Sequence, residues 1–299
     1  MRRARLAVLA VVAVTWLWAG RAAVAQENAA CLGCHEAAGT EVTFPDGSRL
    51  GATVHPQRFG ASVHAPLPCV TCHAGQTDYP HPPRAARSAR AYQVAAQQIC
   101  ATCHAEAAAA YAAGSHGRAV ARGATDVPLC TSCHTAHEVV PPATAAFRNN
   151  APELCGNCHA DEALMARYGV RVVYQAYTEE FHGVTTRLYR IVTPMSPSPA
   201  AVCSDCHTAH RVLPPTDPAS TVSPANVLAT CRTCHATAGR FFATAWTEHR
   251  APSLRFATLV YLVQVFYWIL IPATVAVLVA LTALDLWYWV WVRRRRRRA

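Results

Sequence analysis

The chain has 299 residues, among them 14 cysteines and 15 histidines, and a formal net charge of +10. A chain of this length can bury enough apolar surface to fold without disulfides, so the cysteines need another explanation. The 52% hydrophobic and 15% charged residues exclude a disordered acidic protein and a low-complexity chain. The excess positive charge lies at the two ends of the chain, and the long segment between them therefore lacks the basic surface of a nucleic-acid-binding protein.

The first 25 residues have the pattern of an export signal. Arginines near the start precede an apolar stretch from Leu6 to Ala19, and Ala23-Val24-Ala25 has the small side chains of a signal-peptidase site. We predict that residues 1–25 are a signal peptide and that the mature chain begins at Gln26. The alternative is a permanent N-terminal anchor, for which this apolar stretch is short.

All 14 cysteines fall into seven copies of Cys-x-x-Cys, and each copy is followed at once by His. Two thiols at this spacing can reach both vinyl groups of one porphyrin, and the adjacent imidazole then meets the iron. We therefore predict seven covalently bound haem c groups. The predicted attachment residues are Cys31, Cys34, Cys69, Cys72, Cys100, Cys103, Cys130, Cys133, Cys155, Cys158, Cys203, Cys206, Cys231 and Cys234. The predicted proximal iron ligands are His35, His73, His104, His134, His159, His207 and His235.

Three other uses of Cys-x-x-Cys fit the sequence less well. Zinc ribbons do not require a histidine directly after every pair of cysteines, and they would not need seven pairs. Redox dithiols of the thioredoxin type call for one pair in a βαβ setting. Disulfides suit an exported protein but place no demand on the next residue.

Eight further histidines could supply the second axial ligands: His55, His64, His81, His116, His137, His182, His210 and His249. One of them follows each motif after the first, and two follow the first motif. We therefore predict two imidazoles on most irons, with His55 or His64 as the spare. Order along the chain does not assign each histidine to an iron, because neighbouring haems can exchange ligands in space.

A repeat groups the motifs into units. Leu129–Pro142 reads LCTSCHTAHEVVPP and Val202–Pro215 reads VCSDCHTAHRVLPP. Each copy has a His-Gly pair upstream, at His116 and His182, and a further motif downstream. A looser version surrounds the second and third motifs, so we predict a haem domain at residues 26–255 with one haem followed by three two-haem units.

The predicted fold class is a multihaem cytochrome c fold of short α-helices and irregular loops around a haem core, with little or no β-structure. Helix formers predict helices at Ala105–Ala113, Asp161–Tyr168 and Ala236–Trp246, separated by proline-rich stretches. Val170–Ala176 is the candidate strand. With about 33 residues for each haem, the porphyrins must supply much of the apolar core.

Residues 256–292 contain one charged residue, Asp285, and no histidine, which predicts one C-terminal transmembrane helix. Aromatic clusters at 266–268 and 287–291 mark its two interfaces. The arginine-rich tail at 293–299 stays in the cytoplasm by the positive-inside rule, so the haem domain faces the periplasm. We read Asp285 as an interfacial carboxylate, with a role in proton transfer or partner binding as the alternative.

Motif type and histidine placement over residues 31–250 resemble those of the membrane-anchored, periplasm-facing multihaem c-type cytochromes of bacterial respiratory chains. The resemblance implies closely packed haems that pass single electrons between a membrane cytochrome b or quinol-oxidising subunit and periplasmic redox proteins. The tetrahaem quinol dehydrogenases of this group have four motifs and an N-terminal anchor. This chain instead has seven motifs and an apolar segment at its C-terminus.

Ligand chemistry favours electron transfer over catalysis, because two imidazoles close both axial positions of an iron. Met165 and Met195 sit in no recognisable ligand pattern. His249 lies seven residues before the apolar segment, which predicts a seventh haem near the membrane surface. The alternative function is a reductase of a small nitrogen or sulfur oxyanion with one open haem. The version that uses a proximal lysine is excluded, since the chain has no lysine.

Overall fold

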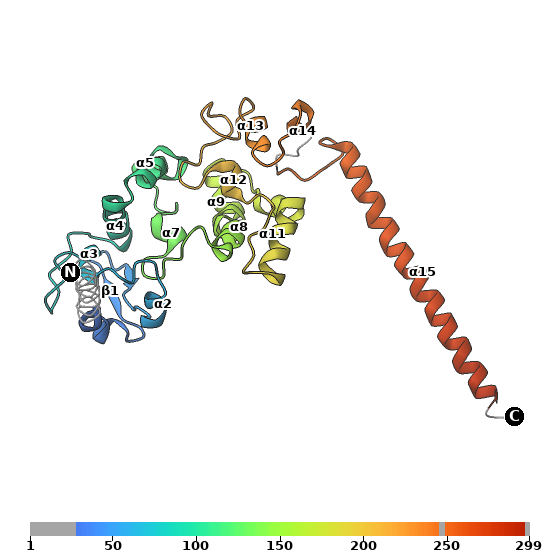
Figure 1. The fold of residues 1–299 in the computed structure, drawn as a ribbon, viewed down its shortest axis with the longest axis horizontal. Helices are drawn as coiled ribbons and strands as arrows, with labels where there is room; N and C mark the ends of the chain where they lie inside the picture. The colour runs from blue at the N-terminus through green and yellow to red at the C-terminus, as the bar shows by residue number, and fades with distance from the viewer. Residues whose placement is uncertain (1–27, 245–248, 297–299) are drawn as a thin grey trace, which may run out of the picture. The chain divides into compact units, whose positions relative to one another are not determined.

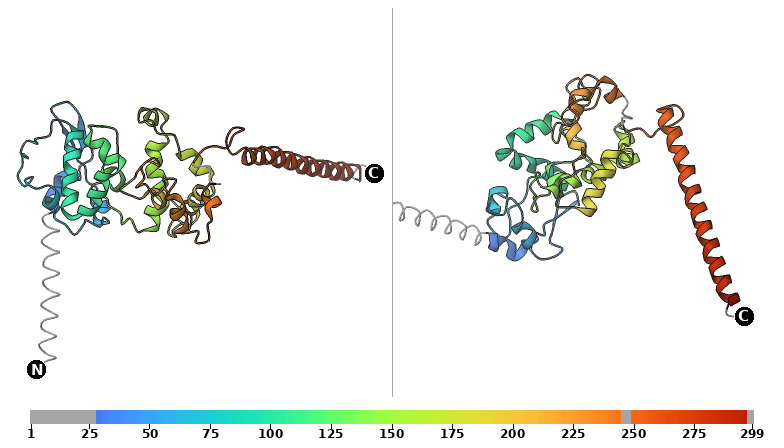
Figure 2. Two further views of the ribbon diagram at one scale, coloured as in Figure 1. Left: turned by 90° about the horizontal axis from the view of Figure 1, so that it is seen from above. Right: turned by 45° about the vertical axis from the view of Figure 1, so that its right-hand side comes forward.

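The computed structural model describes residues 28–244 and 249–296. They form two compact units, and the division lies between Gly239 and Arg240. The predicted signal peptide lies outside the described residues. The first unit consists of short helices and loops that follow one another through space in chain order (Figure 1, Figure 2). Its labelled helices are α2 (Pro56–Gly60), α3 (Cys69–Cys72), α4 (Ala89–Cys103), α5 (Ala105–Ala113), α6 (Ser115–Ala121), α7 (Cys130–His134), α8 (Ala145–His159), α9 (Glu162–Arg167), α10 (Tyr174–Glu179), α11 (Phe181–Val192), α12 (Cys203–His207) and α13 (Val227–Arg232).

The predicted fold class is confirmed, since helices and loops dominate and the described residues contain one two-stranded sheet. The predicted helix at Ala105–Ala113 is α5. The helix predicted at Asp161–Tyr168 is α9, which begins after Asp161 because that carboxylate caps it by accepting the Leu164 amide at 2.9 Å. The helix predicted at Ala236–Trp246 is found only in part: residues 236–239 form a turn and irregular chain, Arg240–Thr244 form α14, and residues 245–246 lie outside the described residues.

The strand predicted at Val170–Ala176 is wrong. Residues 170–173 are irregular and α10 begins at Tyr174, whose ring lies against Gly156 of α8 and whose hydroxyl donates to Glu153. This packing favours a helix over the β-propensity of the valines, which have no neighbouring strand to pair with.

The strands that do form were not predicted. Strands β1 (Glu41–Thr43) and β2 (Arg49–Gly51) pair antiparallel, with Val42 opposite Leu50. Between them lies Pro45-Asp46-Gly47-Ser48, where Gly47 has φ +83° and the Asp46 carboxylate accepts the Ser48 amide at 2.9 Å. An Asp-Gly turn between short runs of β-formers is a hairpin signal that the sequence did contain.

The internal repeat of the sequence is also a repeat of structure. Helices α5 and α6 pack together before α7, and α10 and α11 pack together before α12. The two helix pairs need a glycine after the histidine, because a Cβ at Gly117 would lie 2.3 Å from the Tyr111 carbonyl oxygen and one at Gly183 would lie 2.0 Å from that of Tyr177. The same two tyrosines donate hydrogen bonds to carbonyls just before the next motif, at 2.6 Å and 2.9 Å. The repeat therefore fixes a histidine-bearing helix relative to the motif that follows it.

The buried apolar side chains of the described residues are few. Two of the most buried, Val202 and Leu129, stand directly before a motif. The complete set is Phe44, Ala119, Val127, Leu129, Met165, Tyr177, Ala200, Val202, Leu213 and Ala238. So small a core for a unit of this length fits the expectation that large prosthetic groups complete it.

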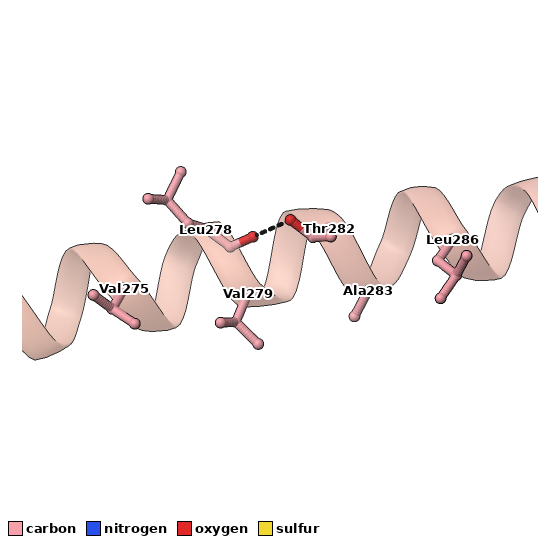
Figure 3. A pocket seen from close by; sticks show the side chains of 6 residues that line it. All are labelled: Val275, Leu278, Val279, Thr282, Ala283 and Leu286. Atoms are coloured by element: carbon pink, nitrogen blue, oxygen red, sulfur yellow. Dashed lines mark hydrogen bonds between the residues drawn. The ribbon is translucent and has the colours of Figure 1, made fainter.

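The second unit contains α15 (Thr258–Arg296), a 39-residue helix with a mean hydropathy of 2.3 in its most apolar window. It is long and apolar enough to cross a membrane, as predicted, and it runs about 58 Å, roughly twice the thickness of the hydrocarbon layer. A shallow groove on one side is lined by Val275, Leu278, Val279, Thr282, Ala283 and Leu286 (Figure 3). The Thr282 hydroxyl donates to the Leu278 carbonyl at 2.8 Å, so this face offers lipid or another helix an apolar surface.

Candidate haem-binding sites

Both cysteines of the first six motifs lie in helices, whereas in the seventh Cys231 lies in α13 and Cys234 in the turn that follows it. The second, fourth and sixth motifs start the short helices α3, α7 and α12, and the third, fifth and seventh end or follow α4, α8 and α13. The first motif lies in helical residues 28–35. Helical residues three apart lie on the same face, which turns both thiols of a motif to the same side. All 14 cysteines are free thiols, and none is fully buried.

Local hydrogen bonds hold the repeated motifs in place. The backbone N–H of Leu129 donates to the Ser132 hydroxyl at 3.0 Å, and that of Val202 donates to the Asp205 carboxylate at 2.8 Å. These bonds close the first turns of α7 and α12. The residue directly after each of these two motifs has a positive φ angle, 59° at Thr135 and 61° at Thr208. The two copies therefore share their entry and their exit.

An ion pair joins α8, the helix that carries the fifth motif, to the sixth motif. Arg148 of α8 makes a bidentate pair with Asp205 of α12, with both N–O distances 2.9 Å. The buried Asn149 side chain donates to the Ser196 carbonyl and accepts the Ser198 amide, each at 2.9 Å. Paired charges and a fully satisfied amide make this junction specific in its geometry.

The structure places six motif histidines next to six of the additional histidines, with the planes of their rings at 26° to 58° to each other. Each pair joins one predicted proximal ligand to one predicted distal ligand. The distances between ring centres are 6.0 Å for His35–His81, 6.1 Å for His104–His64, 6.0 Å for His73–His137, 6.3 Å for His159–His116, 6.1 Å for His134–His210 and 6.2 Å for His235–His182.

These separations fit an iron between each two imidazoles. Two metal–imidazole bonds of about 2 Å each separate the two coordinating nitrogens by about 4 Å. Each nitrogen lies roughly 1 Å from the centre of its ring, so the two ring centres are roughly 6 Å apart. Aromatic pairs that merely stack spread over about 4.5 to 7 Å. The six histidine pairs instead fall between 6.0 and 6.3 Å. The residues present therefore fit two axial imidazoles per haem.

Backbone carbonyls orient the rings of the first pair. The Nδ1 atom of His35 lies 2.8 Å from the Ala52 carbonyl oxygen, and the Nδ1 atom of His81 lies 2.8 Å from that of Asp78. A carbonyl on Nδ1 fixes the tautomer and leaves Nε2 as the lone-pair donor. These carbonyl partners were not predicted, because their positions follow from the hairpin and the loop rather than from any sequence motif.

Burial keeps several of these imidazoles in the form that binds metals. Burial, reinforced by the facing His137, lowers the pKa of His73. Burial also lowers the pKa of His116 and His159, which face each other, and that of His134. A lowered pKa keeps an imidazole neutral at neutral pH, and the neutral ring is the iron ligand.

The pairing follows a regular order that the sequence left open. In each predicted two-haem unit the upstream histidine, His64, His116 or His182, lies next to the histidine of the second motif of the same unit. The histidine that follows the first motif of a unit lies next to an earlier motif. His81 lies next to His35 of the leading single motif. His137 and His210 each lie next to the histidine of the first motif of the preceding unit, His73 and His134 respectively. Successive units are thus interlocked through their histidines.

Three predicted ligands lie outside these six pairs. His55 is an exposed residue that precedes α2 and has no ring contact with another histidine in the described part of the chain. Since His64 faces His104 at 6.1 Å, His55 is the better candidate for the spare of the two. His207 ends α12. His249 belongs to the second compact unit of the structure, which begins at Arg240, and has a φ angle of 53°.

Thiols of consecutive motifs are near enough to interact. Burial, followed by contact with Cys31, raises the pKa of the Cys69 thiol to about 11. The neighbouring thiols are Cys31 with Cys69, Cys72 with Cys100 and Cys103, Cys100 with Cys130, Cys133 with Cys155 and Cys158, Cys155 with Cys203, and Cys206 with Cys231 and Cys234. A thioether sulfur carries no proton, so these pKa shifts would not exist in the haem-bound protein. They indicate only which cysteines lie close to one another. They place the seven motifs in a single file that follows chain order.

Comparison with known proteins agrees with this geometry. Residues 118–164 match the family described as "Doubled CXXCH motif". The match covers the fourth and fifth motifs and the part of α6 from Arg118 onward, and it begins two residues after His116. It points to covalently bound haem c, to more than one haem, and to electron transport, and the fold is consistent with a multihaem cytochrome. No curated protein and no solved structure matches the chain.

Proposed function

We propose that this protein is a membrane-anchored electron carrier. It would pass electrons through seven haem c groups between a quinol-oxidising or cytochrome b partner in the membrane and redox proteins of the periplasm. The observation that carries the proposal is the set of six proximal–distal imidazole pairs at 6.0 to 6.3 Å.

The residues of the chain have two roles in this function. The 14 cysteines attach the cofactors, and the paired imidazoles close both axial positions so that no substrate can bind at those irons. When bound, haem c supplies reversible one-electron iron chemistry. The file of neighbouring thiols sets each attachment site beside the next. This arrangement suits conduction along the domain.

The order of the pairs leaves the seventh site open. The first motif of a unit takes its distal histidine from the segment that follows the first motif of the next unit, and no unit follows that of His207. Two predicted ligands remain for His207: His55 precedes all three units, whereas His249 follows the last motif, so we assign His249 by elimination. His249 precedes the apolar helix by few residues, which supports electron exchange with the membrane at this end of the file.

The topology is part of the proposal. Residues 1–25 would direct export, 26–255 would form the periplasmic haem domain, 256–292 would cross the membrane, and 293–299 would remain in the cytoplasm. Four arginines in the last turn of α15 support the cytoplasmic end, because arginine is retained on that side. Haem attachment outside the cytoplasm agrees with the same orientation.

Low-temperature EPR of the oxidised full-length holoprotein tests this function. We expect low-spin ferric signals for all haems, and no change on adding nitrite, hydroxylamine or sulfite, because imidazoles fill both axial positions. A high-spin signal that shifts with one of these ligands would contradict the proposal and favour the reductase. The same titration on the His55→Ala variant is the control, with an unchanged spectrum expected.

A further inference from the structure

Helix α11 has its apolar side chains on the outside. Phe181, Val184, Leu188 and Ile191 are exposed by 80%, 52%, 57% and 67%. Their 3-4-3 spacing places them in one stripe along the helix, which we call the α11 stripe. The residues that α11 buries are instead Gly183 and Thr186. A helix of a soluble domain has the opposite distribution, so the α11 stripe has a contact outside this unit to make.

A haem does not account for most of this stripe. His182, which faces His235, defines the side of α11 nearest a bound cofactor. Successive helical residues differ by about 100°, so Val184, Leu188 and Ile191 lie about 120° to 180° around the helix from His182. The α11 stripe therefore points away from the His182–His235 site and from Gly183 and Thr186, the residues that the helix buries.

The chemistry around the stripe favours a lipid surface as its occupant. Within α11 the charged residues are Arg187 and Arg190, and the acidic residues nearest the stripe, Glu179 and Glu180, stand before its first turn. Arg190 is paired with Glu153 at 2.7 Å, whereas exposed Arg187 stands beside the stripe, within about 60° of Val184 and Ile191. An apolar face with a cationic flank is the pattern of helices that lie in the membrane interface next to anionic lipids. The same chain carries α15, which is long and apolar enough to cross a membrane and, as an anchor, would raise the effective concentration of this domain at the bilayer.

We propose that α11 lies in the outer interface of the membrane, with the α11 stripe in contact with acyl chains and Arg187 at anionic headgroups. This second contact would orient the haem domain on the bilayer. Resting on the proposed function, it also places the His182–His235 site beside the lipid surface, where a membrane electron donor could reach it.

Photolabelling of the full-length holoprotein tests this contact. The protein is reconstituted into vesicles of phosphatidylethanolamine and phosphatidylglycerol that contain a lipid with a diazirine on its acyl chain, and labelled peptides are mapped by mass spectrometry. We expect label in residues 181–192 as well as in α15. In the double variant Leu188→Glu with Ile191→Glu, the amount of label in α11 should fall at least about tenfold and that in α15 should stay the same, since carboxylates leave the acyl region.

The matched control is Val170→Glu with Val172→Glu, which changes two exposed valines before α10 and should leave the α11 label unaltered. Label confined to α15, or α11 label that survives the glutamate pair, would overturn the proposal. Absence of α11 label from a protein that is dimeric in the vesicles would overturn it as well, in favour of a second copy as the occupant. Haem content and EPR are recorded on every sample, so the electron-transfer proposal is judged separately from this contact.

Discussion

Substitution of His210 by alanine is expected to convert about one seventh of the haem from low spin to high spin, because one iron loses an axial imidazole. We expect this iron to be the one that His134 would bind, since the His134 and His210 rings lie 6.1 Å apart. His210 is only three residues from His207 in the sequence, so a local assignment would name a different haem. Quantitative EPR of the oxidised protein measures the converted fraction.

A combined variant decides between these two assignments. Cys130→Ala with Cys133→Ala removes the fourth attachment site, and His210→Ala added to it should then produce no further high-spin haem. If His210 instead serves the iron at His207, the high-spin signal will persist in the combined variant. His55→Ala is the control for replacing a histidine as such, and it should leave all haems low spin.

Two arginines at the centre of α15 are expected to abolish stable membrane integration. The aromatic residues Trp268 and Trp287 are 19 residues apart, which spans about 28 Å of helix and matches the hydrocarbon layer. Leu278 and Val279 lie midway between them. Each arginine there costs about 2.5 to 3.5 kcal/mol, so Leu278→Arg with Val279→Arg costs roughly 5 to 7 kcal/mol. Haem absorbance in the pellet after alkaline carbonate extraction reports the effect.

The matched control is Leu262→Arg with Val263→Arg, which changes two exposed residues of the same helix outside the aromatic boundaries. Arginine at the interface can extend into water, so this variant should remain in the pellet. Loss of both variants from the membrane would show that the aromatic residues do not mark the span. Retention of the central pair would show that α15 is not the anchor.

Sequence alone was sufficient where the chemistry is local. The spacing within each motif predicts which cysteines and which histidine serve one porphyrin, and the apolar length of α15 predicts a span. The repeat predicts two equivalent units, and α7 and α12 do share capping and exit geometry. These features need no information from residues far along the chain.

The pairing of distal histidines could not be predicted, because it depends on how separate segments fold back on one another. His137 reaches His73 across 64 residues, past the third and fourth motifs. No local pattern encodes that contact. The strand expected at Val170–Ala176 failed for a related reason: a strand needs a partner, and Tyr174 finds its packing against α8 instead.

The number of haems per chain is the most direct measure of this account. Intact-protein mass spectrometry of the purified full-length protein counts covalent haem additions, and pyridine haemochrome absorbance gives the same ratio independently. Seven haems and no titratable thiol are predicted, since all 14 cysteines would be in thioether bonds. Fewer haems with free thiols left over, or zinc in their place, would contradict the account.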